Sequence, residues 1–225
     1  MKNCIPLLLL VFAPVATSFA APPTGQIHIG WAMTSITPEQ PVALAGQFHK
    51  RISERVESPC TATVLAIETR KAKQSLEQAI MVSCDLVLIA DHLQPRLRKM
   101  LAGRLPGFDP KKLFLNATHT HTGPVTRAIG WYTVDDKGVM KPPAYVDFML
   151  KKIAAAIESA WTNRAPGGVS WGLGHAVVGS NRRMVYRTAQ GQPPFGGGTA
   201  KMYGSNKTPA FLSVEGSEDT GIEML

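Results

Sequence analysis

The sequence has little cysteine, few charged residues and, beyond its N-terminus, no long apolar run. Only 3 of its 225 residues are cysteine, which excludes a small scaffold held together by disulfides. No later stretch reaches the ~18 uninterrupted apolar residues that a membrane-spanning helix needs. The motifs HExxH, paired CxxC and a complete GxGxxG are absent as well. These absences argue against a disulfide scaffold, a protein with a membrane-spanning helix after the N-terminus, and the sites that those motifs mark.

Glycine and proline are plentiful instead. The 20 glycines and 17 prolines indicate many turns and long connections rather than a helical bundle. Hydrophobic residues make up 44% of the chain, which is enough to bury a core and argues against disorder.

The first 21 residues have the pattern of a secretory signal peptide. Lys2 is the charged start, residues 5–15 form an apolar core, and Ser18-Phe19-Ala20 is a small-x-small cleavage site. We therefore expect an exported protein, periplasmic or secreted, with a retained N-terminal anchor as the alternative.

Basic residues exceed acidic ones in the mature chain. Loss of Lys2 reduces the 24 basic residues to 23 against 16 acidic ones, a net charge of +7. Six basic residues gather over a short stretch: Arg96, Arg98, Lys99, Arg104, Lys111 and Lys112. They form either a peripheral contact with an anionic membrane surface or the solvated side of a helix. No nucleic-acid recognition motif accompanies them, so a nucleic-acid partner is not expected.

Hydrophobic periodicity predicts strands alternating with two helices. We expect strands over 27–34, 60–69, 79–85, 113–117 and 169–178, with strand-like patches at 210–214 and 222–225. We expect helices over 93–105 and 144–162, and a segment that is mostly loop over 181–208. The class is α/β or α+β, with a mixed sheet and flanking helices. Residues 22–225 are read as one partial domain, because the chain stops as a new strand-like run begins.

Cys60 and Cys84 lie on the two strands expected to form a hairpin. If that hairpin turns at about residue 74, Cys84 faces Val64 rather than Cys60. Four residues along a strand span roughly 13 Å, which is beyond disulfide reach. We therefore expect two free, buried thiols.

The strongest chemical signal is the segment from Asn116 to Pro124, NATHTHTGP, directly after a buried strand. Alternation along an extended backbone predicts that His119 and His121 point to the same side. Neutral imidazole is a common zinc ligand, and the turn at Gly123-Pro124 leaves room beside the rings. The alternative is that the two histidines lie on the surface at a polar strand end and bind no metal.

Two histidines do not complete a catalytic zinc site, which normally has three protein ligands and a water molecule. The other four histidines are expected to be structural: His28, His49, His92 and His175. Further ligands are expected beyond residue 225.

Weaker signals accompany the histidine segment. Residues 168–172 match G-x-S-x-G, but a nucleophile elbow needs a helix after the serine and an extended run is expected here. The glycine-rich stretch 191–199 lacks the Gly-Lys-Ser/Thr ending of a phosphate-binding loop, so we expect it to be a flexible loop. Asp85 either accepts a hydrogen bond from a metal-bound histidine, positions solvent or caps the next helix. Arg182 either holds a substrate oxygen or lies exposed in a loop.

Taken in order, several segments resemble the N-terminal part of the neutral/alkaline non-lysosomal ceramidase family. Residues 29–38 are similar to the family's opening GxA…DITP, 44–46 to its MAGY-like turn, and 82–86 to its S-x-D-L strand end. Residues 116–124 are similar to its hallmark SATHTHSGPGG, and 179–183 to its G-x-N-R-S. The resemblance covers roughly residues 27–190. Thr122, Val125 and Thr126 depart from it.

The resemblance implies a secreted zinc amidase that hydrolyses the N-acyl bond of ceramide to sphingosine and a fatty acid. It implies that His119 is a zinc ligand, that His121 shapes the pocket beside the metal, and that Arg182 lies near the substrate. The substrate would be a lipid or another N-acyl small molecule. The alternatives are a catalytically inactive truncated secreted domain and a metal hydrolase of another ester or amide.

Overall fold

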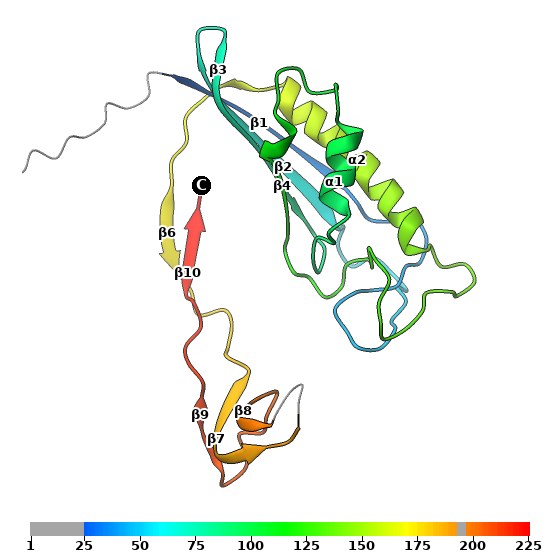
Figure 1. The fold of residues 1–225 in the computed structure, drawn as a ribbon, viewed down its shortest axis with the longest axis vertical. Helices are drawn as coiled ribbons and strands as arrows, with labels where there is room; N and C mark the ends of the chain where they lie inside the picture. The colour runs from blue at the N-terminus through cyan, green and yellow to red at the C-terminus, as the bar shows by residue number, and fades with distance from the viewer. Residues whose placement is uncertain (1–24, 193–196) are drawn as a thin grey trace, which may run out of the picture. The chain divides into compact units, whose positions relative to one another are not determined.

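The computed structural model describes residues 25–192 and 197–225, which form two compact units divided after Gly168 (Figure 1). The predicted signal peptide, and part of the stretch 191–199, lie outside the described residues.

The first unit contains a five-stranded mixed sheet with the strand order β4-β3-β2-β1-β5. The strands are β1 (Gln26–Ser35), β2 (Thr61–Lys71), β3 (Gln74–Cys84), β4 (Leu113–Ala117) and β5 (Ala165–Pro166). All neighbouring pairs are antiparallel except β3 and β4, which run parallel. The predicted mixed sheet with flanking helices is confirmed.

Two helices cover one face of this sheet, side by side in Figure 1: α1 (Leu93–Met100) and α2 (Pro142–Thr162). A short 3₁₀ turn, η1 (Pro110–Lys112), precedes β4. Helix α2 has Pro142 and Pro143 in its first turn, where proline loses no helical hydrogen bond. Helix α1 ends at Met100, earlier than predicted, although Leu101 and Leu105 beyond it are still buried.

The core lies between the sheet and the helices. Alternate residues of β2 and of the second half of β3 belong to the core cluster that also contains residues of α2, as the period of a strand requires: Ala62, Val64, Ala66, Ile80, Val82 and Cys84. Gly30 on β1 allows α2 to approach closely, because a Cβ at this position would lie 2.0 Å from the carbonyl oxygen of Ala160. Tyr145 is fully buried, and its hydroxyl donates to the carbonyl of Ile36 at 3.0 Å.

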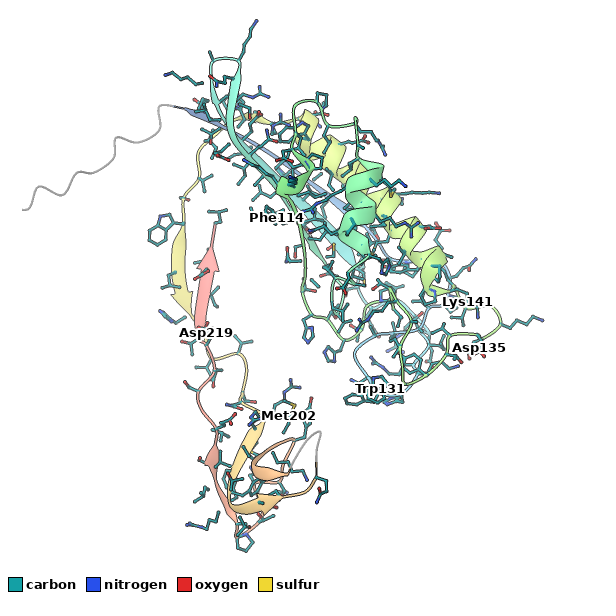
Figure 2. All side chains as sticks on the ribbon, viewed as in Figure 1. Phe114, Trp131, Asp135, Lys141, Met202 and Asp219 are labelled. Carbon is teal, nitrogen blue, oxygen red and sulfur yellow. The ribbon has the colours of Figure 1, made fainter. Side chains whose placement is uncertain are left out.

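The opposite face of the sheet carries an apolar row. Strand register places Trp31, Leu65, Met81 and Phe114 side by side across four strands. Trp31 is 71% exposed and Phe114, labelled in Figure 2, is 53% exposed. The helices therefore cover only one of the two apolar faces of the sheet.

The hairpin between β2 and β3 corrects one prediction. The turn consists of Ala72 and Lys73, with Ala72 at φ 54°, and the register pairs Ala62 with Cys84 rather than Val64 with Cys84. The polar residues expected to link the strands mostly belong to them, because the turn needs only two residues. Both cysteines are nevertheless free, as predicted.

The buried thiol makes stability depend on alkaline pH. Burial, together with the charge of Asp85, raises the pKa of Cys84 to about 12. An unfolded thiol ionises at about pH 8.5, so between these values the folded state retains a proton that the unfolded state has lost. The free energy of unfolding should therefore fall as pH rises above about 8.5. We expect Cys84→Ala to have a shallower slope in urea denaturation between pH 8 and 10; an unchanged slope would contradict this assignment.

The second unit contains two small sheets. One pairs β6 (Gly172–His175) with β10 (Gly221–Met224), and the other has the order β8-β7-β9. These strands are β7 (Arg183–Gln190), β8 (Gly198–Met202) and β9 (Phe211–Val214). The prediction that 181–208 is mostly loop is wrong, because ladder hydrogen bonds to β8 and β9 order β7. The strand predicted over 169–178 is limited to β6.

Candidate functional site

The site begins where two parallel strands end. The register of β3 and β4 pairs Cys84 with Ala117, so Asp85 and Thr118 leave the sheet at the same edge. The Thr118 N–H donates to the carbonyl of Cys84 at 3.0 Å. Carboxyl ends of neighbouring parallel strands are a common place for binding residues, because the loops that follow them diverge.

The Asp85 carboxylate joins the start of β2 to the segment that follows β4 at this edge. Its Oδ2 accepts hydrogen bonds from the backbone N–H of Thr61 at 2.8 Å and from its hydroxyl at 2.9 Å. Its Oδ1 accepts from the Thr118 hydroxyl at 3.2 Å. The helix-cap alternative for Asp85 is wrong, since the N-cap residue of α1 is His92, which makes no side-chain capping bond. Through this hydrogen bond Asp85 holds Thr118 in place and so positions the start of the histidine loop, residues 118–124.

His119 is oriented by a backbone carbonyl. Its Nδ1 lies 2.6 Å from the carbonyl oxygen of Val87. A carbonyl only accepts hydrogen bonds, so Nδ1 carries a proton, and in the neutral tautomer that this favours Nε2 has the lone pair. One of the roles left open for Asp85 was to accept a hydrogen bond from this histidine; in the structure the carbonyl of Val87 accepts it.

His121 approaches that lone pair. The two Nε2 atoms lie 3.4 Å apart, and the rings meet edge to face with their centroids 5.0 Å apart. Both side chains are exposed. The structure thus brings the two histidines together, but extended alternation is the wrong reason, because His119 has φ 63°, in the left-handed region.

The loop that contains Gly46 packs directly against His121. Gly46 has φ 93°, and a Cβ at this position would lie 2.4 Å from the Cγ of His121. The Nη2 group of Arg51 donates to the carbonyl of Ala45 at 3.1 Å and also to the carbonyl of His121. The sequence comparison included Gly46 only as part of a turn, and no pattern pointed to Arg51.

A small apolar cluster packs between these loops. Ala43, Ala45 and Val125 are buried and pack with Val87, Ile129 and other partly buried residues. Backbone hydrogen bonds join the same segments: the N–H of Ala45 donates to the carbonyl of Gly123, and that of Val125 to the carbonyl of Ala43, both at 2.9 Å. The loops are therefore held by packing and by backbone pairing.

A cavity of about 550 Å³ lies next to the histidine loop. Asp85, Thr120, Thr122 and Cys60 contribute to its lining, but the two imidazoles do not. Within residues 25–192 and 197–225, no group of three or more His, Cys, Asp or Glu side chains is placed to hold a metal ion.

The remaining candidates lie elsewhere. Arg182 belongs to the second unit, where its Nη1 donates to the Tyr203 hydroxyl at 3.1 Å. Ser170 is followed by strand β6 rather than by a helix, so the local structure is not a nucleophile elbow. His28 and His175 lie on strands and His92 at the start of α1, as expected.

Half of the six residues in the basic cluster form ion pairs. Arg96 pairs with Asp147, Arg104 with Glu158 and Lys112 with Glu77. Arg98 donates to the carbonyls of Lys111 and Leu113, where it fastens β4. These contacts favour the interpretation as a solvated helix side over an anionic-membrane contact. None of the described helices is both long and apolar enough to cross a membrane.

Solved structures of ceramidases have a fold similar to that of this chain. The neutral ceramidase from Pseudomonas aeruginosa matches with a TM-score of 0.57 and 21% identity over 73% of this chain. The chain is similar in fold to neutral ceramidase. A ceramidase complexed with C2 matches with a TM-score of 0.55 and 19% identity over 72% of this chain.

The likeness to ceramidase extends over part of those enzymes. The chain spans about 25% of the length of both solved ceramidases. No family model matches the sequence, and no curated protein matches it. The predicted resemblance to ceramidase is thus supported by the three-dimensional fold.

Proposed function

We propose that this chain carries part of the active site of a zinc-dependent amide hydrolase that acts on a lipid N-acyl substrate. The ceramidase-like fold supports the class of enzyme, and the histidine pair supports the metal. The activity belongs to a protein of ceramidase length, since the chain spans a quarter of the enzymes it matches.

The observation that carries the proposal is the 3.4 Å separation of the two Nε2 atoms. Two nitrogens bound to one tetrahedral zinc at about 2.0–2.1 Å would lie about 3.3 Å apart. The hydrogen bond from His119 to Val87 fixes the tautomer that binds metal through Nε2 and holds the ring in position. These residues fit a zinc ion.

In this proposal His119 is a zinc ligand, and His121, whose Nε2 lies at the spacing of a second ligand, shapes the pocket beside the metal. When bound, zinc would supply a Lewis acid that polarises an amide carbonyl and lowers the pKa of a water molecule. Asp85 and Thr118 hold the start of the histidine loop, and Gly46 and Arg51 hold its end. Arg182 is proposed to bind a substrate oxygen through its planar fork of donors.

Zinc titration of the purified chain tests the metal site. We expect His119→Ala to lower zinc affinity at least tenfold, because loss of even an orienting partner of a ligand costs about 10- to 100-fold. His175→Ala is the matched control, since His175 is exposed on β6 and its affinity change should be negligible. Equal affinity in the wild type, His119→Ala and His121→Ala would refute the metal assignment.

The substrate class needs its own assay. Matched N-acyl amides and acyl esters of the same chain length should be offered to the protein with zinc. Hydrolysis of the amide supports the proposal, whereas hydrolysis of the ester alone supports a different metal hydrolase. Export is a further prediction, and N-terminal sequencing of the mature protein checks for cleavage after residue 21.

A further inference from the structure

A second cavity, of about 540 Å³, lies in the first unit outside the histidine site. It is formed by the start of α1, the start of α2 and the loop over 126–134; Figure 2 labels Trp131 and Lys141 in the surrounding segments. Its wall is mostly apolar: Ala128, Ile129, Val134, Pro142, Pro143 and Val146. Neither histidine of the candidate zinc site lines it. Its volume is within the range of about 300–1,000 Å³ typical of small-molecule sites.

Thr126 supplies a polar group inside this apolar wall. Its side chain lines the cavity and the residue is only 6% exposed. The Thr126 hydroxyl is not among the buried unpaired polar atoms of the described residues, so it is open to the cavity. Together with Val125, it stands at the positions where this chain departs from the ceramidase pattern. A polar group that enters the cavity would replace water at this hydroxyl.

Arg127 adds a positive charge at the rim. It lines the same cavity, is exposed, and forms no ion pair within the described part of the chain. The second arginine there, Arg96, already pairs with Asp147, so its charge is compensated. Arg127 therefore carries an uncompensated charge in the lining that also includes Thr126.

We propose that this cavity binds a single-chain carboxylate, such as a medium-chain fatty acid. The carboxylate would accept hydrogen bonds from the Thr126 hydroxyl and from the fork of Arg127, whose planar geometry matches a carboxylate. The alkyl chain would lie along Ile129, Val134 and Val146, where it leaves water. The proposal does not depend on the zinc site, because none of the residues proposed to bind zinc lines this cavity.

Calorimetric titration of the full chain with sodium decanoate, below its micelle concentration and without zinc, tests the assignment. Butyrate, decyltrimethylammonium and decyl phosphate separate the contributions of the chain, the charge and the head group. We expect decanoate to bind more tightly than all three. Arg127→Glu should weaken decanoate binding about tenfold or more, and Thr126→Val, which removes only the hydroxyl function, about threefold to tenfold.

Two further variants make the test specific. Arg187→Ala removes an exposed charge from the second unit and should leave affinity unchanged. Ala128→Phe fills the cavity without changing charge and should abolish binding, while circular dichroism confirms folding. Equal binding of decanoate and decyltrimethylammonium, unchanged affinity in Arg127→Glu, or tighter binding of decyl phosphate would overturn the carboxylate assignment.

Discussion

Glu68→Gln should lower the free energy of unfolding by about 3–5 kcal/mol, because it removes the charge that pairs with a buried arginine. The Glu68 carboxylate is 4% exposed and accepts from Arg164 Nη2 at 2.9 Å and from Arg70 Nε at 2.8 Å. Arg164 is 7% exposed and lies against the Trp161 ring, 3.2 Å from its centroid. Urea denaturation at pH 7 measures the loss.

Glu77→Gln is the matched control for Glu68. Glu77 pairs with Lys112 but is 77% exposed, so water replaces the lost contact and stability should hardly change. Losses of similar size in the two variants would show that the buried pair contributes nothing beyond a surface pair.

Acid titration provides a second measurement of the same pair. Burial alone would raise the pKa of Glu68, but hydrogen bonds from Ser75, Arg164 and Arg70 and the charge of Arg164 outweigh it and lower this pKa. The contribution to stability is therefore present above about pH 4.3 and is lost as pH falls through the folded pKa. The acid slope of the wild type should be steeper than that of Glu68→Gln.

Gly46→Ala should displace the His121 ring and lower zinc affinity about tenfold or more. The new Cβ would lie 2.4 Å from Cγ and 2.6 Å from Cβ of His121, so the imidazole must shift from its position beside His119. The φ of 93° adds backbone strain for any residue with a side chain. Zinc titration and thermal denaturation of the same preparation separate the two effects.

Gly103→Ala isolates the backbone strain in that experiment. Gly103 also has positive φ, at 75°, but a Cβ there would meet nothing within 4 Å. The Gly103→Ala variant should be less stable than the wild type and should bind zinc with the same affinity. If Gly46→Ala also keeps its zinc affinity, the position of His121 does not matter for metal binding.

Local patterns predicted the elements of the first unit well. Period-2 alternation identified the strands that became β2 and β3, and the apolar stripe of 144–162 identified α2. These patterns are reliable here because each element buries one face against a single large core. The hairpin register was missed, since a two-residue turn at Ala72 with positive φ has no glycine or asparagine to announce it.

The second unit was harder to predict for a related reason. Only half of the residues of strand β7 are apolar and few of its side chains are buried, so its order comes from hydrogen bonding to neighbouring strands rather than from burial. Such pairing depends on segments distant in sequence. No local pattern carries that information.

Local periodicity and spacing were enough to predict the mixed sheet with its flanking helices and the pair of histidines after a buried strand. The free thiols were predicted through a hairpin register that proved wrong. The contacts that hold the histidine pair appear only in the folded chain. The carbonyl of Val87, the close approach of Gly46 and the guanidinium of Arg51 come from loops far apart in the chain. They meet because strand pairing and a small apolar cluster bring those loops together, and neither leaves a periodic mark in the sequence.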